Sequence, residues 1–219
     1  TTAGPPGKEQ AMSDDDQMWV PTGRGVLAWL RNLGGRLAAP RVDPPELAAV
    51  EAEIAATPDP RAVRAVARAR QHVGTGRYGL GRGGRHPEAV TPFDRDGLCD
   101  CSGYASWALG LDRYQPGAIG GDWISTDAIV RDATGPRRMF RAVELTDARP
   151  GDLVVYGGRH VGGVRVRIGH VGLVVEPGAT WEAIRVVHCH GGKAPAVSES
   201  SAALWGRRGG IVARLVAWG

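Results

Sequence analysis

The chain has 219 residues, which is enough for one substantial domain and an additional terminal segment. Its apolar fraction of 42% and charged fraction of 23% are ordinary for a globular protein. No apolar stretch approaches the length of a bilayer-spanning helix, so we expect no transmembrane segment. The net charge of +4 suits an anionic partner, but it is too mild to choose between nucleic acid, a membrane surface and an anionic cell wall.

Residues 1–60 are predicted to form an N-terminal extension. Its first residues are small, polar and acidic, which is typical of disorder, and helical spacing predicts short helices over 18–38 and 46–56. The start lacks the basic-then-apolar layout of an export signal, and Met12 is a candidate natural start. A Pro-Asp-Pro break then sets the boundary of the main domain, 61–219. The extension is expected to dock onto this domain or onto a partner.

Within the main domain, helical patterns come first and strand patterns later. Helices are predicted over 61–73, from Cys101 onward and over 125–133. Strands are predicted over 153–156, 165–175 (as one strand or two), 184–189 and 211–217. Turns rather than crossover helices separate these strands, so the pattern predicts an α+β fold with N-terminal helices packed on a central antiparallel β-sheet.

The three cysteines, Cys99, Cys101 and Cys189, are too few for a disulfide framework. Cys101 lies where a loop gives way to a helix, so free amide groups and the helix dipole favour a thiolate there. Asp100 is placed to cap this helix, and Gly103 leaves room beside the sulfur for a substrate carbonyl. The alternative is a buried structural cysteine.

Two further positions carry imidazoles. His170 begins a predicted strand, and in the next strand Ile184, Val186 and His188 share one face because side chains alternate. If the two strands are neighbours, His170 faces His188 (or His190) across one end of the sheet. A helix docked on that face would bring the Cys101 sulfur against them, as in a cysteine nucleophile for acyl transfer.

The motifs around these residues resemble those of the NlpC/P60 cysteine peptidases, bacterial enzymes of papain-like fold that cut peptidoglycan stem peptides. The resemblance covers about residues 61–219, with the motifs in the family's order along the chain. They are Tyr-Gly at 78–79, Asp-Cys-Ser-Gly-Tyr at 100–104, Arg-Pro-Gly-Asp-Leu-Val at 149–154, Gly-His-Val-Gly-Leu-Val at 169–174 and Val-Val-His at 186–188.

This resemblance implies that Cys101 is the nucleophile, His170 the general base and acid, and His188 the residue that orients His170, with His190 as the alternative orienter. The Cys101 amide and the Tyr78 hydroxyl are candidates for stabilising the oxyanion. Residues expected on the substrate or oxyanion side are Tyr78, Asp100 and Ser102. The loop between Tyr78 and Cys101 and the connection 156–170 are longer than in the family pattern, which predicts a narrowed or redirected groove.

The implied activity is hydrolysis of amide bonds in peptidoglycan stem peptides, most typically between γ-D-glutamate and a diamino acid, by an endopeptidase or a related amidase. We expect no metal or other cofactor and no nucleic-acid partner. The implied location is secreted or cell-wall-directed; a natural start at Met12 instead fits a cytoplasmic or phage-delivered enzyme.

Two alternatives use the same residues. One is a zinc site, because Cys-x-Cys and His-Cys-His offer enough donors for tetrahedral coordination. Its ligands would come from Cys99, Cys101, His188, Cys189 and His190. Against it, neighbouring residues of a strand point to opposite faces. The other is a non-catalytic module that binds wall peptides, against which the intact cysteine and histidines argue weakly.

Overall fold

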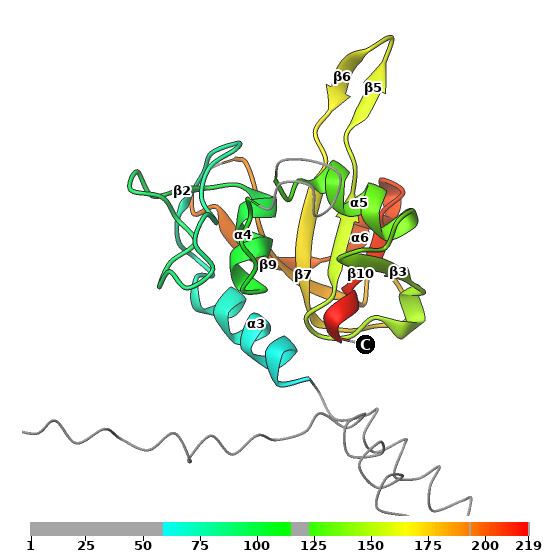
Figure 1. Ribbon diagram of the computed structural model, residues 1–219, viewed down its shortest axis with the longest axis horizontal. Helices are drawn as coiled ribbons and strands as arrows, with labels where there is room; N and C mark the ends of the chain where they lie inside the picture. Colours follow the sequence, from blue (N-terminus) through cyan, green and yellow to red (C-terminus); the bar gives the residue numbers. More distant parts are fainter. Residues whose placement is uncertain (1–58, 115–122, 193, 219) are drawn as a thin grey trace, which may run out of the picture. The chain divides into compact units, whose positions relative to one another are not determined.

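The computed structural model of the protein describes residues 59–114, 123–192 and 194–218, which belong to one unit, Pro58–Gly219 (Figure 1). The helices predicted over 18–38 and 46–56 lie outside the described residues, as does nearly all of the predicted extension. Its boundary near residue 60 therefore stays a prediction.

The centre of the domain is a six-stranded sheet in which every neighbouring pair is antiparallel. Its spatial order is β3-β10-β4-β7-β8-β9. The strands are β3 (Phe140–Val143), β10 (Ile211–Leu215), β4 (Leu153–Tyr156), β7 (His170–Glu176), β8 (Arg185–Cys189) and β9 (Val197–Ser201). The predicted α+β class with an antiparallel sheet is confirmed. The two edge strands, β3 and β9, are not among the predicted strands.

The helices are α3 (Pro60–Gln71), α4 (Cys101–Ala108), α5 (Thr126–Thr134) and the short α6 (Ala203–Arg207). The first three agree with the prediction, and each starts at a side-chain cap from Asp59, Asp100 or Ser125 that accepts a backbone N–H of the first turn. Every residue of α4 is buried, because this helix lies between α3 and the sheet.

Alternation along the strands divides the core in two. Val171, Leu173 and Val175 of β7 pack with α4 in the larger core, while Val174 lies in the second core with Trp205 of α6. A Cβ at Gly172 would lie 3.2 Å from the Trp205 ring, so glycine allows this tryptophan to rest directly on β7. Helices thus cover both faces of the sheet, and Cys101 belongs to the larger core.

Smaller elements surround this frame. β1 (Arg77–Tyr78) and β2 (Leu98–Cys99) form a short parallel pair ahead of α4. β5 (Arg159–Val161) and β6 (Val164–Arg167) pair with each other in a hairpin that stands away from the sheet (Figure 1). Short 3₁₀ helices are η1 (Leu145–Asp147) and η2 (Val216–Trp218); the strand predicted over 211–217 gives way to η2 after Leu215. Among the described helices, none is long and apolar enough to span a bilayer.

Candidate active site

Cys101 is the first residue of α4, as the sequence predicts. Asp100 caps the helix: its Oδ1 accepts the amide of Gly103 at 2.8 Å, and its Oδ2 accepts the amide of Gly81 at 2.7 Å. Cys101 is 4% exposed. The helix start is thereby tied to the glycine-rich loop that precedes it, and the sulfur is held in place.

A buried ion pair fixes this cap. The Nη2 of Arg113 lies 2.7 Å from Asp100 Oδ2 and also donates to Ser102 Oγ at 3.0 Å. Ser102 in turn donates to Asp100 Oδ1 at 3.2 Å. The side chains of Asp100 and Ser102 are therefore engaged with one another and with Arg113, and they act on the site by holding the loop and the helix together.

Gly103 has a different role from the one expected. A Cβ at this position would lie 2.6 Å from Arg113 Nη1 and 2.9 Å from the Arg82 carbonyl, so its missing side chain makes room for the guanidinium. Gly84, at φ +64°, packs directly against Gly103, and a Cβ added at position 84 would lie 2.1 Å from the Gly103 carbonyl oxygen. These glycines serve the packing of the loop on α4 rather than access of a substrate.

The thiol is protonated in this environment, contrary to the thiolate expected from the helix terminus. Burial, with a smaller contribution from the nearby Asp100, raises the pKa of Cys101 to about 12. Hydrogen bonds from the amides of Val171 and Ser102 lower it, but less than burial raises it. The amide of Val171 places the sulfur beside the start of β7, next to His170.

His170 and His188 form a hydrogen-bonded pair, as the strand patterns predict. His170 Nε2 lies 2.8 Å from His188 Nδ1, across the neighbouring strands β7 and β8. Both rings pack on Trp205, with ring centroids 5.2 Å away in each case. Burial lowers the pKa of His170 to about 4 and that of His188 to about 3, so both imidazoles are neutral at pH 7.

The thiol and the imidazole pair both lie at the start of β7, but they pack against different neighbours. Cys101 packs in the larger core with Val171, whereas His170 stacks on Trp205 of the second core. The reason is alternation: the residue after His170 points to α4. The two groups are related through the start of β7, where the Val171 amide donates to the sulfur.

His188, not His190, makes the hydrogen bond to His170. The ring centroid of His190 lies 5.0 Å from that of His188, and its Nδ1 is 3.1 Å from the carbonyl oxygen of Gly191. His188 uses its second nitrogen as well, since Nε2 lies 3.0 Å from Ser200 Oγ and 3.4 Å from Ser198 Oγ. Both serines belong to β9, the edge strand that the sequence pattern does not predict.

Tyr78 lies next to the candidate nucleophile. Burial raises its pKa, and the neighbouring Cys101 and Asp100 raise it further, including through a hydrogen bond between Tyr78 and Cys101. The phenol is therefore a neutral O–H donor beside the sulfur at any physiological pH.

A cavity of about 270 Å³ opens onto Cys101. The loop at Leu80 and Gly81, the α5 residues Thr126 and Asp127, and Trp123 line it together with the start of α4. Arg165 of β6 and Ile168, which follows β6, close one side, and Arg165 Nη2 lies 3.5 Å from Asp127 Oδ2. The extended connection 156–170 thus borders the cavity at the candidate nucleophile.

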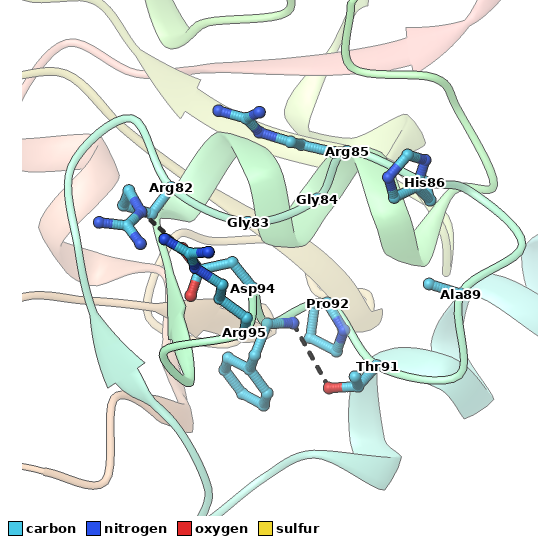
Figure 2. Close-up of a pocket in the computed structure, with 11 residues that line it drawn as sticks. Arg82, Gly83, Gly84, Arg85, His86, Ala89, Thr91, Pro92, Asp94 and Arg95 are labelled. Atoms are coloured by element: carbon cyan, nitrogen blue, oxygen red, sulfur yellow. Dashed lines mark hydrogen bonds and ion pairs between the residues drawn. The ribbon is translucent and has the colours of Figure 1, made fainter.

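Figure 2 shows a larger hollow, of about 490 Å³, between the loop at 82–86 and residues 91–95. Arg82 and Asp94 form an ion pair at its edge. None of the predicted site residues lines this hollow.

The zinc alternative lacks an assembled ligand set. Within the described ranges, no three His, Cys, Asp or Glu side chains are arranged to hold a metal ion. On β8, His188 contacts Trp205, whereas Cys189 lies in the larger core, where its Sγ donates to the Cys99 carbonyl at 3.3 Å. The five donors are therefore divided between the two faces of the sheet.

Three residues of the site are not predicted from the sequence: Arg113, Ser200 and Trp205. Arg113 follows α4 in a loop, Ser200 lies in a polar segment without strand alternation, and Trp205 lies in a helix of five residues. No local pattern links them to the cysteine or the histidines, and a covarying position in related sequences is the signal that would have found them.

The sequence matches no protein-family model and no curated protein. Among solved structures, the chain is similar to one from Staphylococcus aureus subsp. aureus Mu50, described as similar to lipoprotein, NLP/P60 family, at 18% identity and a TM-score of 0.41. The match covers 73% of this chain and 43% of that chain, so the present chain spans less than half of that protein's length.

Proposed function

We propose that the protein is a cysteine hydrolase that cleaves amide bonds in peptidoglycan stem peptides, with Cys101 as nucleophile, His170 as general base and acid, and His188 as its orienting partner. The observation that carries the proposal is the 2.8 Å hydrogen bond between His170 and His188 at the start of β7, where the next amide, that of Val171, contacts the Cys101 sulfur. Thiol, imidazole and orienting group in this order are the parts of a cysteine nucleophile.

In the proposed reaction a substrate carbonyl enters the cavity beside Cys101. Burial favours neutral Cys101 and His170, so proton transfer from Sγ to His170 accompanies attack on the carbonyl carbon instead of preceding it. The carbonyl oxygen becomes negative, and the Cys101 amide and the Tyr78 hydroxyl are the donors proposed to stabilise it.

The C–N bond then breaks, and His170 gives its proton to the leaving amine. Water attacks the remaining thioester with His170 again as base, which releases the acid and restores the thiol. His188 accepts a hydrogen bond from the imidazolium form of His170 during each step.

The substrate class comes from the motif resemblance, and the finer assignment is a bond between γ-D-glutamate and a diamino acid. The cavity of about 270 Å³ is slightly smaller than the roughly 300–1,000 Å³ that is usual for ligand sites, which suits a short peptide rather than a folded protein. Arg165, which pairs with Asp127 at 3.5 Å on the cavity wall, is the cationic side chain that a free carboxylate of such a peptide would meet.

The decisive experiment is incubation of the purified protein with muropeptides of known structure, followed by mass spectrometry of the products. We expect two fragments whose masses together exceed that of the substrate by one water, one with a new carboxylate and the other with a new amine at the cleaved bond. Cys101→Ala is expected to abolish turnover, by at least about 1,000-fold, with an unchanged circular dichroism spectrum. Full activity of Cys101→Ala would show that Cys101 is not the nucleophile and would overturn the proposal.

One observation favours a second candidate, a non-catalytic module that holds wall peptides. Burial keeps the Cys101 thiol protonated and only slightly exposed. A binding module does not need a reactive thiol, whereas a nucleophile must lose this proton and reach the substrate. The same incubation separates the two, because the binding module retains muropeptides on a column without changing their mass.

A further inference from the structure

The outermost part of the histidine chain lies on the edge strand β9. Ser200 Oγ is 3.0 Å from His188 Nε2, and the same oxygen donates to the backbone carbonyl of Ser201 at 3.4 Å. A hydroxyl carries a single proton. If that proton points to the Ser201 carbonyl, Ser200 Oγ faces His188 as an acceptor, and the proton between them belongs to His188 Nε2.

This placement fixes the next two groups. A neutral imidazole has one N–H and one lone pair, so His188 with a proton on Nε2 presents a lone pair at Nδ1. That lone pair lies 2.8 Å from His170 Nε2, which must then carry the proton. His170 is left with its lone pair on Nδ1, the ring nitrogen nearer to the backbone of β7, whose next amide contacts the Cys101 sulfur.

The opposite arrangement would disable the base. If the hydroxyl of Ser200 donated to His188 Nε2, His188 would carry its proton on Nδ1 and direct it at His170 Nε2. His170 would then be protonated on Nδ1 and unable to accept a proton there. Protonation of its other nitrogen would place two N–H groups against each other at the distance of a hydrogen bond.

We propose that Ser200 is a positioning residue that sets the tautomers of His188 and His170, so that Nδ1 of His170 is the nitrogen that takes the Cys101 proton. This inference rests on the proposed function for its role in turnover. Ser200 does not touch the thiol; it acts through His188. Once His170 becomes an imidazolium, the lone pair on His188 Nδ1 accepts the hydrogen bond from its Nε2–H, which stabilises the charged intermediate.

The chain offers a matched control and a conservative replacement. Ser201→Ala removes the neighbouring hydroxyl of the same strand but keeps the carbonyl that Ser200 donates to. Ser200→Thr keeps a hydroxyl at the position facing His188. Ser198, whose Oγ lies 3.4 Å from the same nitrogen, is left intact in every variant.

Two measurements test the inference. The first is the ¹⁵N chemical shifts of the histidine side chains in the labelled full chain, which report the tautomer without reference to activity. In the wild type and in Ser201→Ala we expect protons on Nε2 of both His170 and His188, and in Ser200→Ala a mixture of tautomers for His188. Wild-type spectra with the proton on Nδ1 of either histidine overturn the inference, as do unchanged tautomers in Ser200→Ala.

The second measurement is peptide hydrolysis. Ser200→Ala is expected to lower kcat by about 10- to 100-fold with little change in KM, as is typical for a partner that orients a catalytic imidazole. Ser200→Thr should restore most of kcat, and Ser201→Ala should retain it. A wild-type kcat for Ser200→Ala overturns the inference. If the tautomers are as expected but no variant, wild type included, hydrolyses peptide, the proposed function has failed and the tautomer assignment stands.

Discussion

Asp100 and Arg113 form a fully buried ion pair, with side chains 2% and 0% exposed and a distance of 2.7 Å between Oδ2 and Nη2. Because Asp100 also caps α4 and accepts the amide of Gly81, this pair joins three separate segments at the candidate nucleophile. The position of the sulfur therefore depends on a residue in the loop that follows α4.

Replacing Arg113 by Met should destabilise the fold strongly. The substitution leaves the Asp100 carboxylate buried without its cation, and loss of one partner of a buried pair costs about 3–5 kcal/mol of unfolding free energy. Urea unfolding followed by tryptophan fluorescence measures the loss. Arg82→Met is the control: Arg82 also pairs with carboxylates, Asp94 and Asp96, but is 39% exposed, so it should lose less than about 1 kcal/mol. Equal losses would contradict a special role for the buried pair.

Acid should destabilise the protein through the two histidines. Burial lowers the pKa of His170 from 6.5 to about 4 and that of His188 from 6.5 to about 3. Below pH 6.5 the unfolded chain therefore binds more protons at these two residues than the folded chain does. The contribution of the two neutral imidazoles to the free energy of unfolding is then fully present above pH 6.5 and is lost as the pH falls toward 4. Urea unfolding at about pH 7.5, 6 and 5 should give a steeper loss for the wild type than for His170→Gln. Parallel curves would show that His170 titrates normally in the folded state.

Alkylation should be slow and should begin at Cys101. Burial raises the pKa of this thiol to about 12, so little thiolate exists at pH 7 to react with iodoacetamide. Cys99 and Cys189 are 0% exposed, whereas Cys101 opens onto the cavity. Peptide mass spectrometry after timed alkylation should therefore find Cys101 modified first, at a rate well below that of the urea-unfolded chain. Early modification of Cys189 would contradict this order.

His188→Ala should lower kcat more than His190→Ala. His188 makes the hydrogen bond to His170, whereas the Nδ1 of His190 lies against the carbonyl of Gly191. Loss of an orienting group costs about 10- to 100-fold, and loss of a flanking imidazole should cost only a few-fold. Initial rates on one muropeptide measure both variants, and the reverse ranking would move the orienting role to His190.

Shortening the β5–β6 hairpin should leave the fold intact. β5 and β6 pair with each other and not with the six-stranded sheet, and Val161, Val164 and Val166 are more than half exposed. Replacing residues 160–166 by two glycines should change the unfolding free energy by less than about 1 kcal/mol, because little apolar surface is lost from the core. Since Arg165 is removed from the cavity, KM for peptides with free carboxylates should rise, while KM for their amidated forms should not.

Local patterns are sufficient for the elements that bury apolar runs. Continuous apolar stretches mark central strands, and β4, Leu153–Tyr156, and β7 are predictable for that reason. β9 is not predictable in this way, because it contains the polar residues Ser198, Glu199 and Ser200. It is an edge strand with no neighbour in the sheet on one side, and polar side chains are tolerated there.

The candidate site is predictable residue by residue but not in its arrangement. The capping of α4 by Asp100 and the pairing of His170 with His188 follow from a helix start and from neighbouring strands. The protonation of Cys101 depends on how completely the sheet and helix exclude water around the sulfur. Burial of that kind is set by the whole fold and leaves no mark in a local sequence pattern.

The position of β10 in the sheet has a consequence for biosynthesis. This strand, Ile211–Leu215, lies between β3 and β4, so β3 has no partner in the sheet, and β4 lacks its second one, until residue 215 has left the ribosome. The histidine-bearing strands can pair earlier in translation. A chain truncated before Ile211 would have two unsatisfied strand edges, a product prone to aggregate and to be degraded.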